Sequence, residues 1–355
     1  MRLLSFFVFL SIAPAAGVLA QDQQEVSTAD GICTSVENLR TPVIAPESPA
    51  DAKWLEGCSA ADLYYGASPH QDVDFAAARR CALSAWNARR GQDRGNRDNS
   101  GDLFDFSTQI LAMIYANGDG VPRDLDLATH IVCREVFPLE NPVSDYAGQH
   151  IHVILQLAKM KQADAAARFD YCSSEAKLPD WPEKLVCATI QTRLARKRRE
   201  AHFAELAASW TGEQKDAFAQ ARESFAQYEN MEERAENTCA VPAVLCTMEI
   251  DDRLEAEFAA DMDRFEQGKL PRSTHQDSVA ADGALKAQYQ QLHLAAYRSA
   301  GNLRDKIRDA QRAWLEYRAA FAAFARLRWP SEPGDSWFAF LARERVNQMK
   351  KIVVQ

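Results

Sequence analysis

The chain has 355 residues, of which 47% are hydrophobic and 26% charged, and its formal net charge is −9. This is the composition of an ordinary globular protein, and the length exceeds what a single domain usually needs. The acidic balance argues against nucleic-acid binding, which requires clustered Lys and Arg. Ala, Leu, Glu, Gln and Arg are abundant and alternating Val, Ile and Thr are scarce, which predicts an all-α fold.

The first twenty residues predict a signal peptide. Arg2 precedes an apolar run that ends on Val18-Leu19-Ala20, small or apolar where signal peptidase cleaves. The run is short for a membrane span. We expect cleavage after Ala20 and a periplasmic or secreted protein. A lipid anchor is not expected because no Cys follows the cleavage point, and no later run is long enough to span a membrane. Residues 21–54 are expected to form an extended segment.

The cysteines predict disulfide bonds. All eight lie beyond Ala20, and an even number in an exported chain is typical of a disulfide framework. No Cys-x-x-Cys pair occurs, which argues against a zinc knuckle or a thioredoxin-type site. Eight cysteines allow 105 connectivities. The pairs we favour are Cys58–Cys81, Cys133–Cys172, Cys239–Cys246 and Cys33–Cys187.

An internal repeat occupies the first half of the chain. At a constant offset of 52 residues the stretch from Asp62 matches the stretch from Ile114. The paired identities are Gly66 with Gly118, Asp72 with Asp124, Asp74 with Asp126, Ala76 with Ala128, and Cys81 with Cys133. A period of this size predicts stacked helical hairpins. Gly118 is expected to end a helix in the left-handed conformation, and Gly120 to lie in the turn. Asp124 or Asp126 would cap the next helix, and Ala128 would let two helices approach closely.

The second copy, "LAMIYANGDGVPRDLDLATHIV", resembles the Sel-like repeat, a relative of the tetratricopeptide repeat. The resemblance implies a short α-solenoid over about residues 55–175, within a repeat domain at 55–200. A third copy is suggested at "ADAAARFDYCSS", where Ala167 precedes Cys172 by five positions, as Ala76 precedes Cys81. Repeats of this family serve as protein–protein scaffolds rather than as catalysts.

A heptad stripe predicts the core of a long helix in the second half. It consists of Leu303, Ile307, Ala310, Trp314, Tyr317, Phe321 and Phe324, spaced alternately four and three residues apart. At an offset of 89 residues an earlier segment keeps the pattern, with Ala221, Phe225 and Tyr228 in place of Ala310, Trp314 and Tyr317. We therefore predict tandem helical-bundle modules at residues 201–275 and 276–355, divided near Gly268 and Pro271.

The second of these modules resembles the N-terminal domain of the LprI-type lysozyme inhibitors over about residues 280–352. The residues that carry the resemblance are Leu303, Arg304, Arg308, Ala310, Gln311, Trp314, Tyr317 and Arg318. The segment at about 204–271 looks like a divergent relative. The chain departs from the family pattern at two cysteines, replaced by Phe321 and Phe338, and at a Gly-Gly-Ser turn that is "EPGDS" here. The family's Thr in the final helix is Ala342.

The sequence offers no catalytic, cofactor-binding or metal-binding constellation. It has no Gly-rich phosphate loop, Gly-x-Ser-x-Gly elbow or His-Glu-x-x-His helix. His150 and His152 lack an evident third metal ligand. The paired acids Glu232-Glu233 and Asp251-Asp252 and the basic run at 196–200 are expected to be solvated helix faces.

The function predicted is therefore non-enzymatic protein binding, with no cofactor. The first hypothesis is lysozyme inhibition of the LprI type, because an acidic chain would be steered to a basic enzyme. The alternative is a periplasmic scaffold that binds a partner through its Sel-like repeats. An envelope hydrolase is the least favoured reading. Trp314 and Tyr317 are expected in the core, whereas Arg308 and Arg318 are left open between packing and partner contact. The sequence leaves the oligomeric state open.

Overall fold

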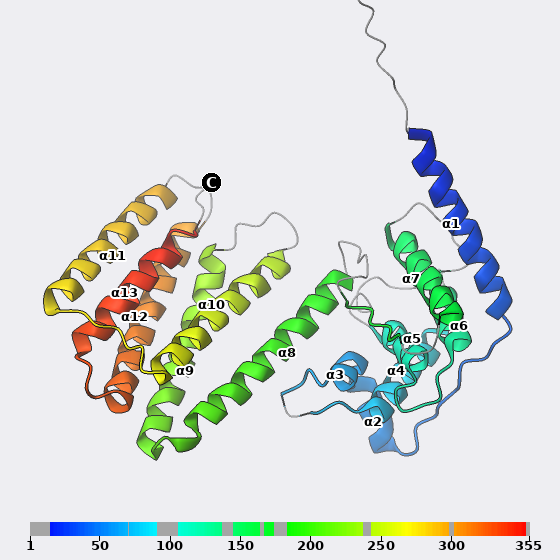
Figure 1. The fold of residues 1–355 in the computed structure, drawn as a ribbon, viewed down its shortest axis with the longest axis horizontal. Helices are drawn as coiled ribbons and strands as arrows, with labels where there is room; N and C mark the ends of the chain where they lie inside the picture. Colours follow the sequence, from blue (N-terminus) through cyan, green and yellow to red (C-terminus); the bar gives the residue numbers. More distant parts are fainter. Residues whose placement is uncertain are drawn as a thin grey trace, which may run out of the picture. The chain divides into compact units, whose positions relative to one another are not determined.

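The computed structural model describes residues 15–69, 71–90, 106–136, 145–163, 167–173, 183–236, 243–297 and 302–352. Over these ranges the chain forms thirteen α-helices, one short 3-10 helix and no strand, which confirms the all-α prediction. The chain divides into two compact units, Met1–Ile190 and Gln191–Gln355, drawn in Figure 1. The boundary lies ten residues before the one predicted, inside a continuous helix, α8 (Glu183–Leu206).

The N-terminal unit contains α1 (Ala15–Val36), α2 (Pro49–Gly57), α3 (Ala60–Tyr65), α4 (Phe75–Arg90), α5 (Ser107–Asn117), α6 (Leu125–Val136) and α7 (Asp145–Gln162). The C-terminal unit contains most of α8, then the 3-10 helix Ala207–Ser209, α9 (Gly212–Glu236), α10 (Ala243–Glu266), α11 (His275–Ala296), α12 (Leu303–Arg328) and α13 (Gly334–Met349).

The segment 21–54, expected to be extended, is largely helical. Helix α1 runs to Val36 and α2 begins at Pro49, capped by the Ser48 side chain. Ala29, Cys33 and Val36 are buried and lie at helical spacing. This apolar stripe indicates a helix, which was not predicted from the sequence. Residues 1–14 lie outside the described residues, so cleavage after Ala20 stays a prediction. Among the described helices none is both long and apolar enough to cross a membrane.

Two helical hairpins share the same turn geometry, α3–α4 and α5–α6. Gly66 and Gly118 end α3 and α5 with φ of 64° and 74°, which confirms the left-handed conformation predicted for Gly118 and shows it at Gly66 as well. Gly120 also has a positive φ, 71°. A Cβ at Gly66 would lie 3.0 Å from the backbone nitrogen of Val73, so this turn excludes a side chain sterically as well as conformationally.

The predicted correspondence at a constant offset of 52 residues is wrong for the helices that follow this turn. Asp74 precedes α4 and accepts a hydrogen bond from the backbone N–H of Ala77, as Asp124 does from Leu127 before α6. The helix starts are thus 50 residues apart, because the first turn is two residues longer. Ala78, fully buried, is the counterpart of Ala128, whereas Ala76 is exposed and Asp72 lies in the turn.

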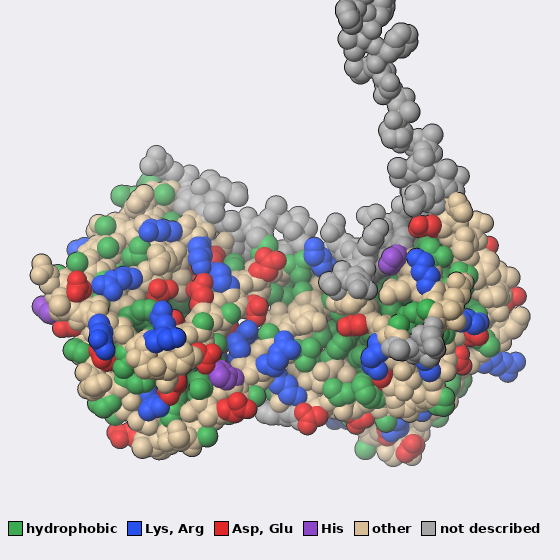
Figure 2. All heavy atoms as spheres, in the orientation of Figure 1, with side chains coloured by type: hydrophobic (Ala, Val, Ile, Leu, Met, Phe, Trp, Pro, Cys, Tyr) green, Lys and Arg blue, Asp and Glu red, His purple; other side chains and the backbone are tan. Residues whose placement is uncertain are grey.

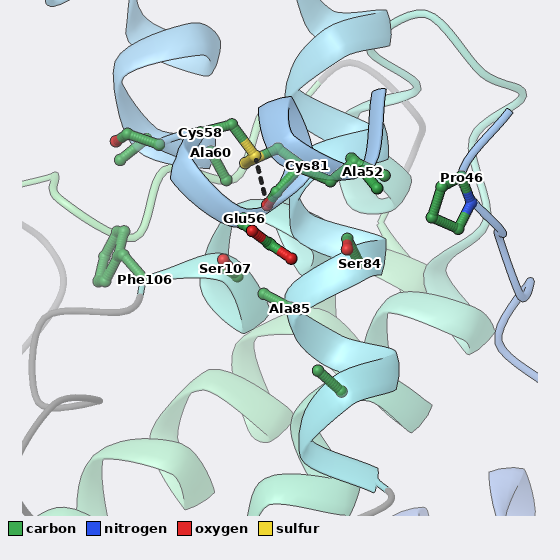
Figure 3. A pocket seen from close by; sticks show the side chains of 14 residues that line it. Pro46, Ala52, Glu56, Cys58, Ala60, Cys81, Ser84, Ala85, Phe106 and Ser107 are labelled. Carbon is green, nitrogen blue, oxygen red and sulfur yellow. Dashed lines mark hydrogen bonds between the residues drawn. A yellow bond between two sulfur atoms is a disulfide. The ribbon is translucent and has the colours of Figure 1, made fainter. Parts of the chain in front are cut away.

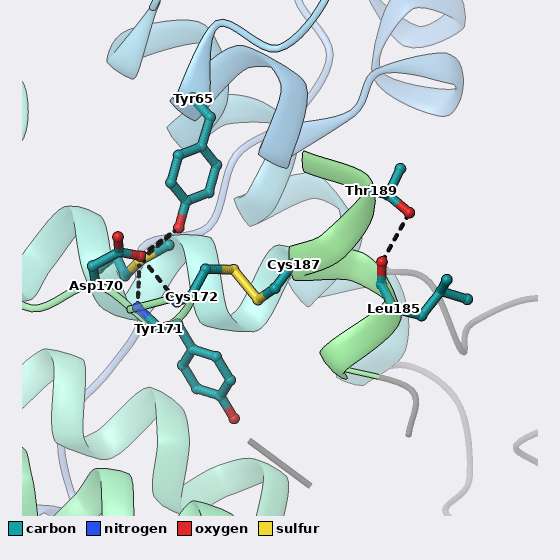
Figure 4. The surroundings of a disulfide bond; sticks show 8 residues. Tyr65, Asp170, Tyr171, Cys172, Leu185, Cys187 and Thr189 are labelled. Atoms are coloured by element: carbon teal, nitrogen blue, oxygen red, sulfur yellow. Dashed lines mark hydrogen bonds between the residues drawn. A yellow bond between two sulfur atoms is a disulfide. The ribbon is translucent and has the colours of Figure 1, made fainter. Parts of the chain in front are cut away.

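The suggested third repeat copy is wrong over its described residues, since 167–173 contain no helix. This segment instead lies against the first hairpins. The Asn117 side chain accepts a hydrogen bond from the Phe169 N–H and donates one to the Phe169 carbonyl, while the Tyr65 hydroxyl donates to Asp170 at 2.7 Å (Figure 4). Short polar bonds of this kind carry no periodic signal in the sequence.

The structure contains three disulfides among the described cysteines. Cys58–Cys81 confirms one predicted pair, and it joins the residue after α2 to α4. The predicted Cys133–Cys172 and Cys33–Cys187 pairs are wrong: Cys33 bonds Cys133, and Cys172 bonds Cys187. Both errors follow from treating residues 21–54 as extended, because a helical α1 brings Cys33 to α6. Cys239 lies outside the described residues, so its predicted bond to Cys246 stays a prediction.

The C-terminal unit is built around the pair α9 and α12, the two helices related by the 89-residue offset (Figure 1). Ala221 and Ala310 are both fully buried, and small residues let two helices approach closely. Tyr228 and Tyr317, which match at this offset, stack with ring centroids 6.0 Å apart and planes 8° apart. The two predicted modules therefore share one hydrophobic core rather than forming separate ones.

The predicted stripe of α12 is buried as expected. Trp314 is 1% exposed, Tyr317 7% and Phe321 2%, while Leu303 is half-buried at the helix start. Helix α10 ends before Gly268, whose φ is +77°, so the predicted divide falls in the turn between α10 and α11. Helix α11 then begins with a capping box between Thr274 and Asp277.

Candidate functional site

Arg318 ties together the three last helices of the C-terminal unit. Its guanidinium donates to Asp282 of α11 at 2.6 Å and to the Phe338 carbonyl of α13 at 3.2 Å. It also lies over the rings of Trp314 and Phe338, at 5.4 and 4.8 Å from their centroids. The Arg318 side chain is only 13% exposed, and these contacts join α11, α12 and α13, although its Nε has no hydrogen-bond partner. Arg318 is thus assigned to packing.

Gln311 belongs to a buried polar network. Its side-chain oxygen accepts from Arg345 Nε at 3.2 Å, and Arg345 Nη1 donates to the Tyr228 hydroxyl and lies 2.6 Å from Glu232. Glu232 and Arg345 are both 0% exposed. Burial alone would lower the pKa of Arg345, but the charge of Glu232 outweighs it and keeps the guanidinium protonated. The expectation that Glu232 lies on a solvated face is wrong.

The remaining resemblance residues divide between core and surface. Ala310 is fully buried, whereas Arg304, Arg308 and Arg312 lie on the exposed side of α12. Arg308 pairs with Asp305 at 2.7 Å and Arg312 with Asp309 at 3.4 Å, each with an acid three residues earlier on α12. Arg312, Asp309 and Glu316 line a shallow groove of about 620 Å³ between α9 and α12.

In the N-terminal unit, hydrogen bonds and ion pairs between side chains engage Tyr64, Asp119 and Arg168. The Tyr64 hydroxyl donates to Asp119 at 2.6 Å, and Arg168 pairs with the same carboxylate at 2.9 Å. Burial, followed by the hydrogen bond to Asp119, raises the pKa of Tyr64. A second hollow, of about 610 Å³, opens beside the Cys58–Cys81 bond and is lined mainly by small side chains such as Ser84, Ala85 and Ser107 (Figure 3). Nothing in that lining assembles a reactive group.

Metal binding finds no support in the described part of the chain. His150 is buried and His152 half-buried on α7, and across the described ranges no three His, Cys, Asp or Glu side chains are placed to hold an ion. Catalytic zinc needs three protein ligands.

The acidic charge is unevenly distributed between the units. Residues 1–190 contain 16 Lys and Arg against 25 Asp and Glu, whereas residues 191–355 contain 25 of each. Figure 2 shows basic and acidic side chains interspersed over the face of the C-terminal unit that it draws. Within this unit, however, residues 229–266 hold twelve acids and three bases. Three of these acids, Glu229, Glu232 and Glu255, are buried, so the charge that could attract a basic partner rests on the other nine, on α9 and α10.

The family comparison concerns the last four helices. Residues 259–342 match the family model "Lysozyme inhibitor LprI". The match begins near the end of α10, includes α11 and α12 whole, and ends within α13. No curated protein and no solved structure matches the chain. The C-terminal unit thus contains a region similar to a family of protein inhibitors, and the residues common to that resemblance mostly hold its helices together.

Proposed function

We propose that the protein is exported and that its C-terminal unit binds a lysozyme, as an LprI-type inhibitor. The observation that carries this proposal is the family match at residues 259–342. Ala310, Trp314 and Tyr317, which carry the resemblance, lie in the hydrophobic core of this unit. Export is supported by the N-terminal sequence and by three disulfides among the described cysteines, which persist in oxidising compartments.

The partner surface in this proposal consists of exposed side chains, because Trp314, Gln311, Tyr317 and Arg318 are engaged internally. Net charge does not provide steering, since the matched region 259–342 contains twelve bases and ten acids. The acidic stretch at 229–266 on α9 and α10 is the part of the unit that complements a basic enzyme. Local complementarity of this kind raises association rates at low salt.

The test is cell-wall clearance by lysozyme, titrated with residues 21–355. Saturable inhibition that weakens as salt is raised from about 20 to 200 mM is expected, because screening shortens the reach of surface charges. Glu249→Lys, at an exposed position of α10 inside the acidic stretch, should weaken inhibition, whereas Asp216→Lys, exposed on α9 outside it, should not. Absence of inhibition against lysozymes of several classes would reject the proposal.

The alternative function is that of a scaffold that binds its partner through the stacked hairpins of the N-terminal unit. It is favoured by one observation, that this unit carries the whole net negative charge of the chain. Cross-linking with mass spectrometry distinguishes the two: links from a bound partner to Lys53, Lys159 or Lys161 support the scaffold. Links confined to lysines of residues 191–352 support the inhibitor.

A further inference from the structure

A charged pocket lies between α8, α9 and α10 of the C-terminal unit, outside the region of the family match. Its volume is about 450 Å³. The carboxyl groups of Glu200, Glu229, Glu233, Asp251 and Glu255 line it. Five acids face only two bases there, Arg196 and Arg222. Such an excess of one charge inside a concave site is uncommon, because close like charges repel one another.

Arg222 pairs with two carboxylates of the pocket, and one of them, Glu255, also lies 3.9 Å from Arg199. Arg222 donates to Glu200 and to Glu255, both at 2.9 Å, and its guanidinium is 5.0 Å from the Phe203 and Phe258 ring centroids. The Nη2 of Arg222 is thus bound to carboxylates of α8 and α10, whereas its Nη1 has no hydrogen-bond partner. Arg196 is exposed, at the mouth of the pocket. Glu229, Glu233 and Asp251 are left without a cation bound to them.

Among these three carboxyl groups, Glu229 is the most buried. It is 6% exposed, and its Oε1 has no hydrogen-bond partner, like the Oδ1 of Asp251. Burial, reinforced by the charges of Glu255 and Asp251, raises the pKa of Glu229 to about 8. Burial likewise raises the pKa of Asp251 to about 6, with Glu233 adding to it. A buried carboxyl without a partner is costly, so its presence beside an open pocket indicates a ligand.

The internal repeat supplies a comparison. At the 89-residue offset, the position of Glu229 in α9 is that of Arg318 in α12. In the second module, at residues 276–355, the chain itself supplies a guanidinium at this position: Arg318 pairs with Asp282 and lies over Trp314 and Phe338. In the first module a carboxyl takes its place and the pocket stays open. The second module thus contains its own cation, and the first has the carboxyl groups to accept one from outside.

We propose that this pocket is a binding site for a basic side chain of a partner protein, whose guanidinium or ammonium group contacts Glu229 and Asp251. A charged donor facing buried carboxylates forms short, strong hydrogen bonds. A metal ion is a poorer fit, because no group of three metal-ligating side chains exists among the described residues. The site stands independently of lysozyme inhibition, since any protein with an exposed Arg or Lys could occupy it.

Binding should be linked to pH. The charged groups of the pocket around Glu229 are Glu233 and Arg222 on its own helix, Asp251 and Glu255 on α10, and Arg196 and Glu200 on α8. A bound cation favours the ionised carboxylate, so binding near neutral pH releases a proton. Affinity for the cation should therefore rise as pH increases from about 6 to about 8.5, the range in which Glu229 loses its proton in the free protein.

The experiment is calorimetric titration of residues 21–355 with Nα-acetyl-arginine amide. The matched probe is the citrulline analogue, which keeps the shape and loses the charge. We expect binding of the arginine probe to be roughly ten-fold tighter than that of the citrulline probe, and to strengthen with pH. Glu229→Gln should remove most of that preference and its pH dependence. Asp216→Asn, exposed on the same helix and outside the pocket, should change neither.

Equal affinity for the two probes would overturn the proposal, as would undiminished arginine binding by a folded Glu229→Gln variant. Should that variant fail to fold, Asp251→Asn, at a half-buried position, provides the same comparison. The lysozyme assay fails or succeeds separately: a chain that binds the arginine probe without inhibiting lysozyme keeps this site and loses only the proposed partner.

Discussion

Replacing Glu229 with Gln should stabilise the protein at alkaline pH and have little effect under acid conditions. The carboxyl is 6% exposed, and burial raises its pKa from 4.5 to about 8. Its folded-state pKa lies above the unfolded value, so the protonated carboxyl is tolerated below pH 4.5. Stability is then lost progressively as pH rises to about 8. Glutamine keeps the shape of the neutral acid and does not ionise.

The magnitude follows from proton linkage. The rise of the Glu229 pKa from 4.5 to about 8 lowers the free energy of unfolding above pH 8 by about 5 kcal/mol, an upper limit because an ionised side chain can move toward water. Between pH 5 and pH 9 the stability difference between variant and native protein should widen by about 4 kcal/mol on the same basis. Asp251 remains in both proteins, so its own titration largely cancels in the difference.

The measurement is urea unfolding at pH 5, 7 and 9, followed by tryptophan fluorescence with the disulfides intact. Asp216→Asn is the control, because it removes an exposed acid from the same helix. A difference between Glu229→Gln and native protein that stays constant within about 1 kcal/mol over this range would refute the reasoning, since linkage then assigns Glu229 an ordinary pKa.

Four further predictions concern the packing and turns of the two units. Trp314→Ala should lower the free energy of unfolding by about 3–5 kcal/mol, because the indole is 1% exposed, and a loss below about 1 kcal/mol would contradict its burial. Glu232→Ala should cost about 3–5 kcal/mol by stranding Arg345, while Glu232→Leu combined with Arg345→Met should cost less in the same denaturation assay. Replacing Cys58 and Cys81 together by Ser should cost about 3 kcal/mol, given their separation of 23 residues, and no change in melting temperature would argue against the bond. Gly118→Ala should cost about 1–2 kcal/mol because φ is 74° there, whereas Gly212→Ala, with open space around its Cα, should cost less.

The features that could be predicted from the sequence are those that recur at regular spacing along the chain. Helical spacing predicted Trp314 and Tyr317 in the core, and Gly118 was predicted correctly as the left-handed end of a helix, α5. Identity at a fixed offset was less dependable: it paired Asp72 with Asp124, although Asp74 caps the equivalent helix. Two extra residues in a turn shift the register of everything after it, and a comparison without gaps does not detect this.

Contacts between distant segments were not predictable from spacing. Cys33 meets Cys133 only because α1 is helical and packs on α6, and Cys172 meets Cys187 across residues that have no helix pattern. Glu232 and Glu229 look like solvated acids in the sequence, yet α10 and α13 cover that side of α9. Ion pairs between different helices leave no regular spacing in the sequence. The burial of a carboxyl group can therefore be recognised only from the three-dimensional structure.

Lysozyme inhibition is the most direct test of the proposed function. Clearance of bacterial cell walls should be measured at low salt with increasing concentrations of residues 21–355, beside the Glu249→Lys and Asp216→Lys variants. The inhibitor proposal predicts saturable inhibition that Glu249→Lys weakens and Asp216→Lys leaves intact. Undiminished clearance at every concentration, for lysozymes of several classes, would contradict it and favour a scaffold that acts through the N-terminal hairpins.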